Sequence, residues 1–136
     1  MESFENFGIQ SAVKTIKELC PGVEFIVLYG SIAEGRNNKL SDIDIAVYPV
    51  GDKKERFESR IKMLGRLSDR FDIQIFQDLP LYIKMEIIRK GNILYYRDYG
   101  TLFGIYLQTI KEYEDFEKHL NTYYSYIGAG ILEETG

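Results

Sequence analysis

The 136-residue chain contains one cysteine and one histidine, and each scarcity excludes a class of site. Cys20 has no second cysteine with which it can close an internal disulfide. Cys20 and His119 together are too few ligands for a zinc site of the usual sulfur and nitrogen type. We therefore expect Cys20 to be a buried packing residue and His119 a surface or packing residue. Any metal site must rely on oxygen ligands.

Long apolar runs and an excess of positive charge are also missing. No run approaches the ~20 apolar residues of a membrane-spanning helix. The amino-terminal segment Met1–Glu5 is acidic and lacks the basic and apolar parts of a secretory signal. The formal net charge is −4, which argues against broad electrostatic binding of nucleic acid. We expect a soluble cytoplasmic protein whose partners include neither a membrane nor long DNA or RNA.

What is present is an ordinary globular composition, with 45% hydrophobic and 28% charged residues. The length suits one domain with a real core and is too short for two. Helical periodicity covers residues 6–19, 53–68, about 80–90 and about 101–127. Strand patterns cover 23–29, 42–48, 71–76 and 93–96. We predict an α/β (α+β) fold, a small mixed sheet flanked by helices, in a single domain over 1–127 with a flexible tail at 128–136.

Three features of the predicted strands carry chemistry. Gly30 and Ser31 follow a buried strand, Asp42 and Asp44 alternate with isoleucine on the next strand, and Asp72 lies on a third. Aspartate is depleted in strands, and two aspartates that point the same way repel each other at close range. Such a pair favours a cation. The alternatives are an ordinary turn at the glycine and a solvated strand end at the aspartates.

If the second and third strands are neighbours, carboxylates on their shared face come within roughly 5 to 8 Å of one another. Mg²⁺ binds a few carboxylates together with phosphate oxygens, and two such ions can assist displacement at phosphorus. Gly30 would let a phosphate approach the backbone. No glycine-lysine-serine or glycine-lysine-threonine follows Gly30 at Walker spacing, which disfavours a P-loop enzyme. The pattern therefore indicates phosphoryl or nucleotidyl transfer.

The segment 30–35, Gly-Ser-Ile-Ala-Glu-Gly, followed by 41–44, Ser-Asp-Ile-Asp, resembles the signature of the nucleotidyltransferase superfamily related to polymerase beta. The spacing of the two segments is similar to that of the minimal nucleotidyltransferases. Segment 72–75 resembles the strand that bears the third carboxylate of that family, and 92–98 resembles a short family strand that ends in arginine-aspartate. The resemblance implies the polymerase-beta-like catalytic core.

The resemblance also implies roles for single residues. The residues assigned to the nucleotide are Gly30, Ser31, Gly35, Arg36 and Ser41. The residues assigned to catalysis and to two Mg²⁺ ions are Asp42, Asp44 and Asp72, and Asp72 is also a candidate base toward the acceptor hydroxyl. The donor implied is ATP. Glu34 departs from the family, which often carries arginine nearby. Arg36 either compensates for the charge of Glu34 or is an ordinary solvated loop arginine.

Stand-alone members of this family commonly act as antitoxins that add AMP to a tyrosine of a helical HEPN toxin. The resemblance thus implies a HEPN-family partner and an oligomer or hetero-complex. Two alternatives stay open: transfer to a small hydroxylated molecule such as an aminoglycoside, and a catalytically weak antitoxin that neutralises its partner by binding. Tyrosines 123, 124 and 126 belong either to the core or to a partner surface, since tyrosine is common in both.

Overall fold

The computed structural model describes residues 8–33, 35 and 42–135, with the backbone alone at 31, 32 and 129–135. Its centre is a four-stranded sheet in the order β3-β2-β1-β4. The strands are β1 (Phe25–Tyr29), β2 (Ile43–Val47), β3 (Phe71–Ile75) and β4 (Asn92–Tyr96). β1 is antiparallel to β2 and β4, whereas β2 and β3 are parallel. This confirms the predicted small mixed sheet.

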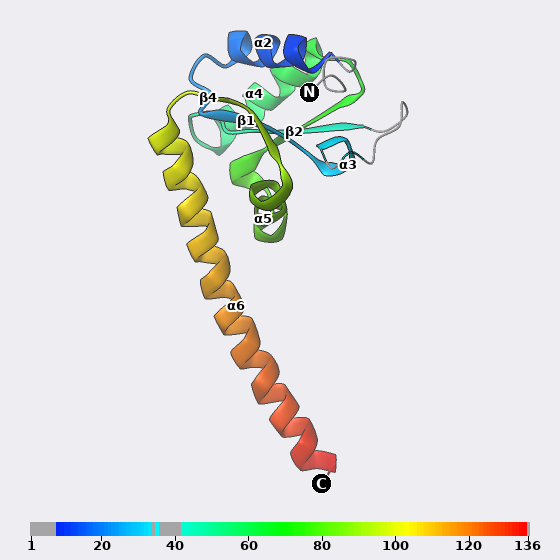
Figure 1. Ribbon diagram of the computed structural model, residues 1–136, viewed down its shortest axis with the longest axis vertical. Helices are drawn as coiled ribbons and strands as arrows, with labels where there is room; N and C mark the ends of the chain where they lie inside the picture. Colours follow the sequence, from blue (N-terminus) through cyan, green and yellow to red (C-terminus); the bar gives the residue numbers. More distant parts are fainter. Residues whose placement is uncertain (1–7, 34, 36–41, 136) are drawn as a thin grey trace.

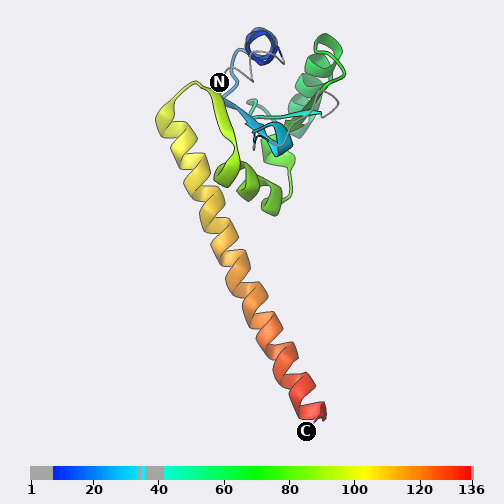
Figure 2. The same cartoon turned by 45° about the vertical axis from the view of Figure 1, so that its right-hand side comes forward.

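Helices cover both faces of the sheet, as Figure 1 and Figure 2 show. They are α2 (Ile9–Leu19), α3 (Gly30–Ala33), α4 (Lys53–Arg66), the 3₁₀ turn η1 (Phe76–Asp78), α5 (Leu81–Lys90) and α6 (Tyr99–Thr135). α2 and α4 lie on one face, and α5 and the first part of α6 lie on the other. None of these described helices combines the length and apolar character that crossing a membrane requires.

The period-two alternation of the strands divides the core into two apolar clusters. Ile43, Ile45 and Ile73 pack beneath α2 and α4. The alternate residues of the same strands, such as Ala46, face α5 and α6. The side chains at the even-numbered positions of β2 and β3 therefore face α5 and α6. Asp44 and Asp72 are among them.

Local hydrogen bonds define where the two longest helices begin. Asp52 accepts from the Glu55 amide at 2.9 Å, and Glu55 accepts from the Asp52 amide at 3.3 Å, which forms a capping box for α4. Asp98 accepts from the Thr101 amide at 2.9 Å and so caps α6. The preceding Arg97 pairs with the buried Glu24 at 2.7 Å. The arginine-aspartate end of β4 thus ties this edge strand to β1 and starts the last helix.

Two helices differ from the prediction in ways that matter below. α6 runs from Tyr99 to Thr135, whereas the sequence pattern predicted a last helix that ends at about residue 127; Leu132, Glu133 and Glu134 favour the longer helix. α4 contacts the core through Met63, and its predicted stripe turns outward, with Phe57 59% exposed. The Arg60 side chain donates to the Ile73 carbonyl at 2.7 Å and fixes this rotation of α4.

The single cysteine and the single histidine have the environments predicted for them. Cys20 is buried against the α2 and α4 cluster, and burial raises the pKa of its thiol. His119 is exposed on α6, with its Nδ1 atom 2.8 Å from the Asp115 carbonyl oxygen.

Candidate active site

The candidate site lies where β1 ends and β2 and β3 begin, on the face that α5 and α6 cover elsewhere. Asp44 of β2 stands opposite Tyr29 of β1 on one side and opposite Asp72 of β3 on the other. The three side chains therefore form a row across the sheet. Gly30 follows Tyr29 directly and begins α3, so the turn predicted to meet phosphate lies at one end of this row.

Asp44 is the electrostatic centre of the row. Burial, followed by the negative charges of Asp72 and Asp42, raises the pKa of Asp44 to about 6. The Asp72 carboxyl lies directly opposite Asp44 on the neighbouring strand and contributes to this rise in the pKa of Asp44. Asp42 is exposed and lies just before β2. Among the described residues, three carboxylates therefore lie at or beside this end of the sheet.

This shift predicts how stability should depend on pH. Folded Asp44 holds its proton up to about pH 6, above the ordinary value of 3.8. The stability that the proton contributes is therefore complete below about pH 4 and is lost between about pH 4 and 6. In EDTA, we expect Asp44→Asn to match wild type in melting temperature near pH 4 and to exceed it by about 2–6 °C at pH 7.5. Equal melting temperatures at pH 7.5 would contradict this.

Position 30 requires glycine for two reasons: its backbone conformation and the closeness of the Asp44 side chain. Its φ is +78°, in the left-handed region that side chains disfavour. A Cβ atom built on Gly30 would also collide with the Oδ2 atom of Asp44. Asn92 of β4 donates from Nδ2 to the Ala33 carbonyl at 3.2 Å and holds the end of α3 against the sheet. The turn at Gly30 and the side chain of Asp44 are therefore packed directly against each other.

The remaining predicted nucleotide residues are placed only in part. Gly35 has a φ of +76° just after α3. Ser31 lies in α3 and is described by its backbone alone. Arg36, Ser41 and the departing residue Glu34 lie outside the described residues.

Two residues of the site were missed by sequence reasoning. Gln74 donates from Nε2 to the Oδ1 atom of Asp72 at 2.9 Å and orients that carboxylate. Its position two residues after Asp72 on the same face was a signal that could have identified it. Tyr29 is half-buried, and burial followed by the charges of Asp44 and Asp72 raises its pKa. β1 is apolar throughout, so no alternation revealed which face Tyr29 occupies.

The chemistry of these side chains fits a divalent cation. In the described part of the chain, no three histidine, cysteine or acidic side chains form a ready-made metal cluster. Mg²⁺ does not need one, because it is often held by one or two carboxylates together with water and substrate phosphate oxygens. Asp44 and Asp72 supply such a pair, and a bound cation would offset the charges of Asp72 and Asp42 that, after burial, raise the pKa of Asp44.

Two aspartates face each other beside a glycine turn at the end of a strand. This arrangement is typical of enzymes that transfer a phosphorus-containing group with the help of metal ions. Comparison with known families identifies which family of such enzymes this is. The model of the polymerase beta nucleotidyltransferase family matches residues 11–100, and the chain belongs to that family. This confirms the resemblance seen in the sequence, and with it an enzyme class that transfers nucleotides.

Two relatives are similar in sequence. MJ1547 of Methanocaldococcus jannaschii, assigned by name to the protein adenylyltransferases, is 39% identical over 70% of this chain and 73% of its own length. The protein adenylyltransferase MntA of Shewanella oneidensis is 26% identical over 61% of each chain.

Solved structures share the fold. A chain of a toxin-antitoxin crystallised with AMP-PNP superimposes with a TM-score of 0.65 at 21% identity, covering 80% of this chain and 90% of its own. A chain from the complex of tri-AMPylated Shewanella oneidensis HEPN toxin with MNT antitoxin gives 0.60 at 20% identity, covering 81% and 87%. At these identities the likeness establishes the fold, which is the predicted nucleotidyltransferase core.

Proposed function

We propose that this protein is a Mg²⁺-dependent protein adenylyltransferase that transfers AMP from ATP to a tyrosine hydroxyl of a HEPN-type toxin and thereby acts as its antitoxin. The observation that carries the proposal is the facing pair of Asp44 and Asp72 beside Gly30. The names of both relatives support a protein as the acceptor. ATP and Mg²⁺ are both plentiful in the cytoplasm, which is the location we propose.

The proposed reaction is one displacement at phosphorus. The acceptor oxygen attacks the alpha phosphorus of ATP, the bond from that phosphorus to the bridging oxygen breaks, and pyrophosphate leaves. The hydroxyl proton passes to Asp72, whose Oδ1 atom is held by Gln74, and then to solvent. Mg²⁺, held by Asp42, Asp44 and Asp72 and most simply as two ions, would neutralise charge on the phosphates.

The chain's own residues supply the positioning. The left-handed turn at Gly30 leaves backbone without a side chain at the end of β1, where the triphosphate would approach the aspartates. Arg36, Gly35, Ser31 and Ser41 remain the proposed further contacts to the nucleotide. Asp44 is half-buried and so lies in a less polar environment than water. Its interaction with a cation bound there would therefore be stronger.

The test is a transfer assay with three informative outcomes. The purified protein is incubated with MgCl₂, ATP labelled at the alpha phosphate, and a purified HEPN-type toxin. Label on that protein, lost when its acceptor tyrosine is changed to phenylalanine, is the expected result. Label on an aminoglycoside but never on protein would instead establish the small-molecule enzyme. A stable, silenced complex without label would establish neutralisation by binding.

A further inference from the structure

The outer part of α6 carries an apolar stripe that continues the face by which α6 packs on the domain. Leu102, Ile105 and Thr109 face the domain in the first turns. Helical spacing continues this line through Tyr113, whose ring lies 5.3 Å from the Arg89 guanidinium of α5. The stripe then runs on through residues Phe116, Leu120, Tyr123 and Ile127. Steps of four, three and four residues keep these side chains on one side of the helix.

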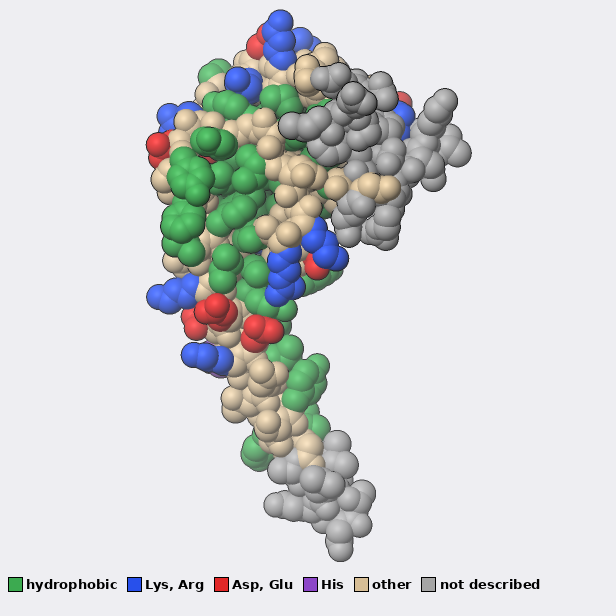
Figure 3. All heavy atoms as spheres, viewed as in Figure 1, with side chains coloured by type: hydrophobic (Ala, Val, Ile, Leu, Met, Phe, Trp, Pro, Cys, Tyr) green, Lys and Arg blue, Asp and Glu red, His purple; other side chains and the backbone are tan. Residues whose placement is uncertain are grey.

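This outer stripe, defined as Phe116, Leu120, Tyr123 and Ile127, projects beyond the domain. α6 extends away from the sheet in both views (Figures 1 and 2). Hydrophobic side chains lie along the projecting helix in Figure 3, below a group of acidic side chains. Phe116 is 52% exposed and Tyr123 is 59% exposed. An apolar heptad-like stripe on a solvent-exposed helix is typical of a surface that packs against another helix.

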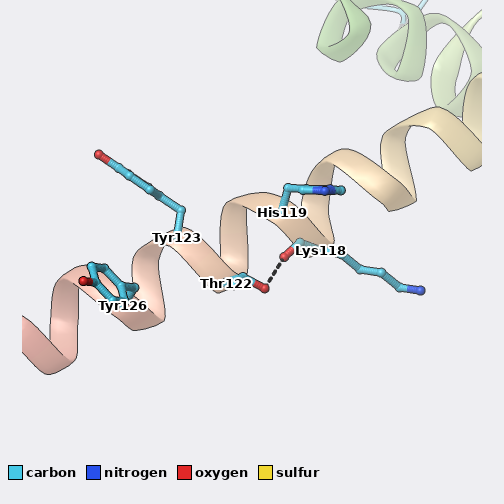
Figure 4. Close-up of a pocket in the computed structure, with 5 residues that line it drawn as sticks. All are labelled: Lys118, His119, Thr122, Tyr123 and Tyr126. Carbon is cyan, nitrogen blue, oxygen red and sulfur yellow. Dashed lines mark hydrogen bonds between the residues drawn. The ribbon is translucent and has the colours of Figure 1, made fainter.

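The face of α6 next to the outer stripe has a different character. A shallow hollow there is lined by Tyr123, which also belongs to the stripe, and by Lys118, His119, Thr122 and Tyr126 of the same helix. Figure 4 shows that the Thr122 hydroxyl is engaged with the Lys118 backbone and that Tyr123 extends freely from the helix. No second element encloses this hollow among the residues that line it. We therefore assign docking to the stripe and not to the hollow.

Charge and position indicate what covers the outer stripe. Residues 111–118 hold four acidic side chains and two lysines, so the stripe has an acidic flank that suits a partner with basic side chains. The outer stripe faces the same side of α6 as α5 does. Tyr113 shows this, because it lies in line with the stripe and contacts Arg89 of α5. α3 lies on that side too in both views. A body seated on the stripe would lie beneath the sheet face that carries Asp44.

We infer that the outer stripe of α6 is the docking surface for the acceptor protein, and that a helix of this partner with an apolar face and basic flanks packs against it. This inference rests on the proposed function for the partner's role as acceptor. The structures of similar fold were solved as toxin-antitoxin complexes, which supports a second protein as the occupant in preference to a second copy of this chain. In this arrangement the outer stripe binds the partner, and the site at Asp44 and Asp72 transfers AMP to it.

The test compares two matched double variants of the full chain. Phe116→Ala with Tyr123→Ala truncates the outer stripe, and Phe57→Ala with Ile61→Ala truncates equally exposed side chains on α4, behind the sheet. Alanine is the best helix former, so both variants should keep their helices. Binding to the purified HEPN-type toxin is measured by calorimetry, and the mass of each variant alone by light scattering. We expect about a 100-fold or larger loss of affinity for the α6 variant and less than threefold for the α4 variant.

The outcomes separate docking from catalysis. If the α6 variant binds as tightly as wild type, the docking inference is overturned, whatever the transfer assay shows. If wild type binds through α6 but never transfers AMP, the proposed function fails and the docking surface stands. If the chain alone is a dimer that the α6 substitutions dissociate, the occupant is a second copy and the inference is overturned.

Discussion

Asp44→Asn should reduce transfer of AMP to the partner by about 10³-fold or more while leaving the protein folded. Asp44 is the residue that faces both Asp72 and Tyr29, and the loss of its charge removes several kcal/mol of cation-dependent stabilisation of the transition state. Asparagine has nearly the same shape, so the sheet register should persist. The initial rate of labelling at saturating ATP and MgCl₂ measures the effect.

The control for Asp44→Asn is Glu58→Gln, which removes one exposed carboxylate from α4 on the far side of the sheet. It should retain the wild-type rate, since it leaves the site untouched. Asp44→Asn should also bind the partner with wild-type affinity, because the outer stripe of α6 is intact. A rate within threefold of wild type for Asp44→Asn would exclude the site as the place of catalysis.

Gly30→Ala should lower both stability and activity, in contrast to Asp44→Asn. A side chain at φ +78° costs roughly 1–2 kcal/mol, and the new Cβ atom also displaces the Asp44 carboxylate. A shift of about 1 Å in a catalytic group can cost about 10²-fold in rate. Denaturant unfolding at pH 7.5 measures the first effect, and the labelling rate measures the second.

Gly65→Ala is the matched control, because a Cβ atom at Gly65 in α4 meets nothing within 4 Å. In that helix, alanine should stabilise the protein by about 0.5–1 kcal/mol without changing the rate. The collision itself is tested in an Asp44→Ala background, where the carboxylate is gone and the cost of Gly30→Ala should shrink to the backbone strain alone. An undiminished cost there would mean that Asp44 is not the obstacle.

Local sequence patterns predicted most elements because each depends on neighbours in the chain. Alternation of aspartate with isoleucine in 42–45 placed Asp44 on one face of its strand, and the structure shows Ile43 and Ile45 on the other. The uniformly apolar β1 gave no such signal, so the place of Tyr29 beside Asp44 was not predicted. The stripe of α4 was read correctly as helical, but its rotation depends on the contact of Arg60 with β3.

The sequence by itself determined the chemical character of the candidate site: a glycine turn, aspartates at period two, and too few cysteine and histidine residues for sulfur or nitrogen ligands. These properties follow from residue identity and from the short-range geometry of strands. Only the tertiary structure decided that β3 pairs with β2, which sets Asp72 directly opposite Asp44 and leaves Asp42 at the margin. Strand order and helix rotation depend on packing between distant segments, as does the projection of α6 beyond the domain.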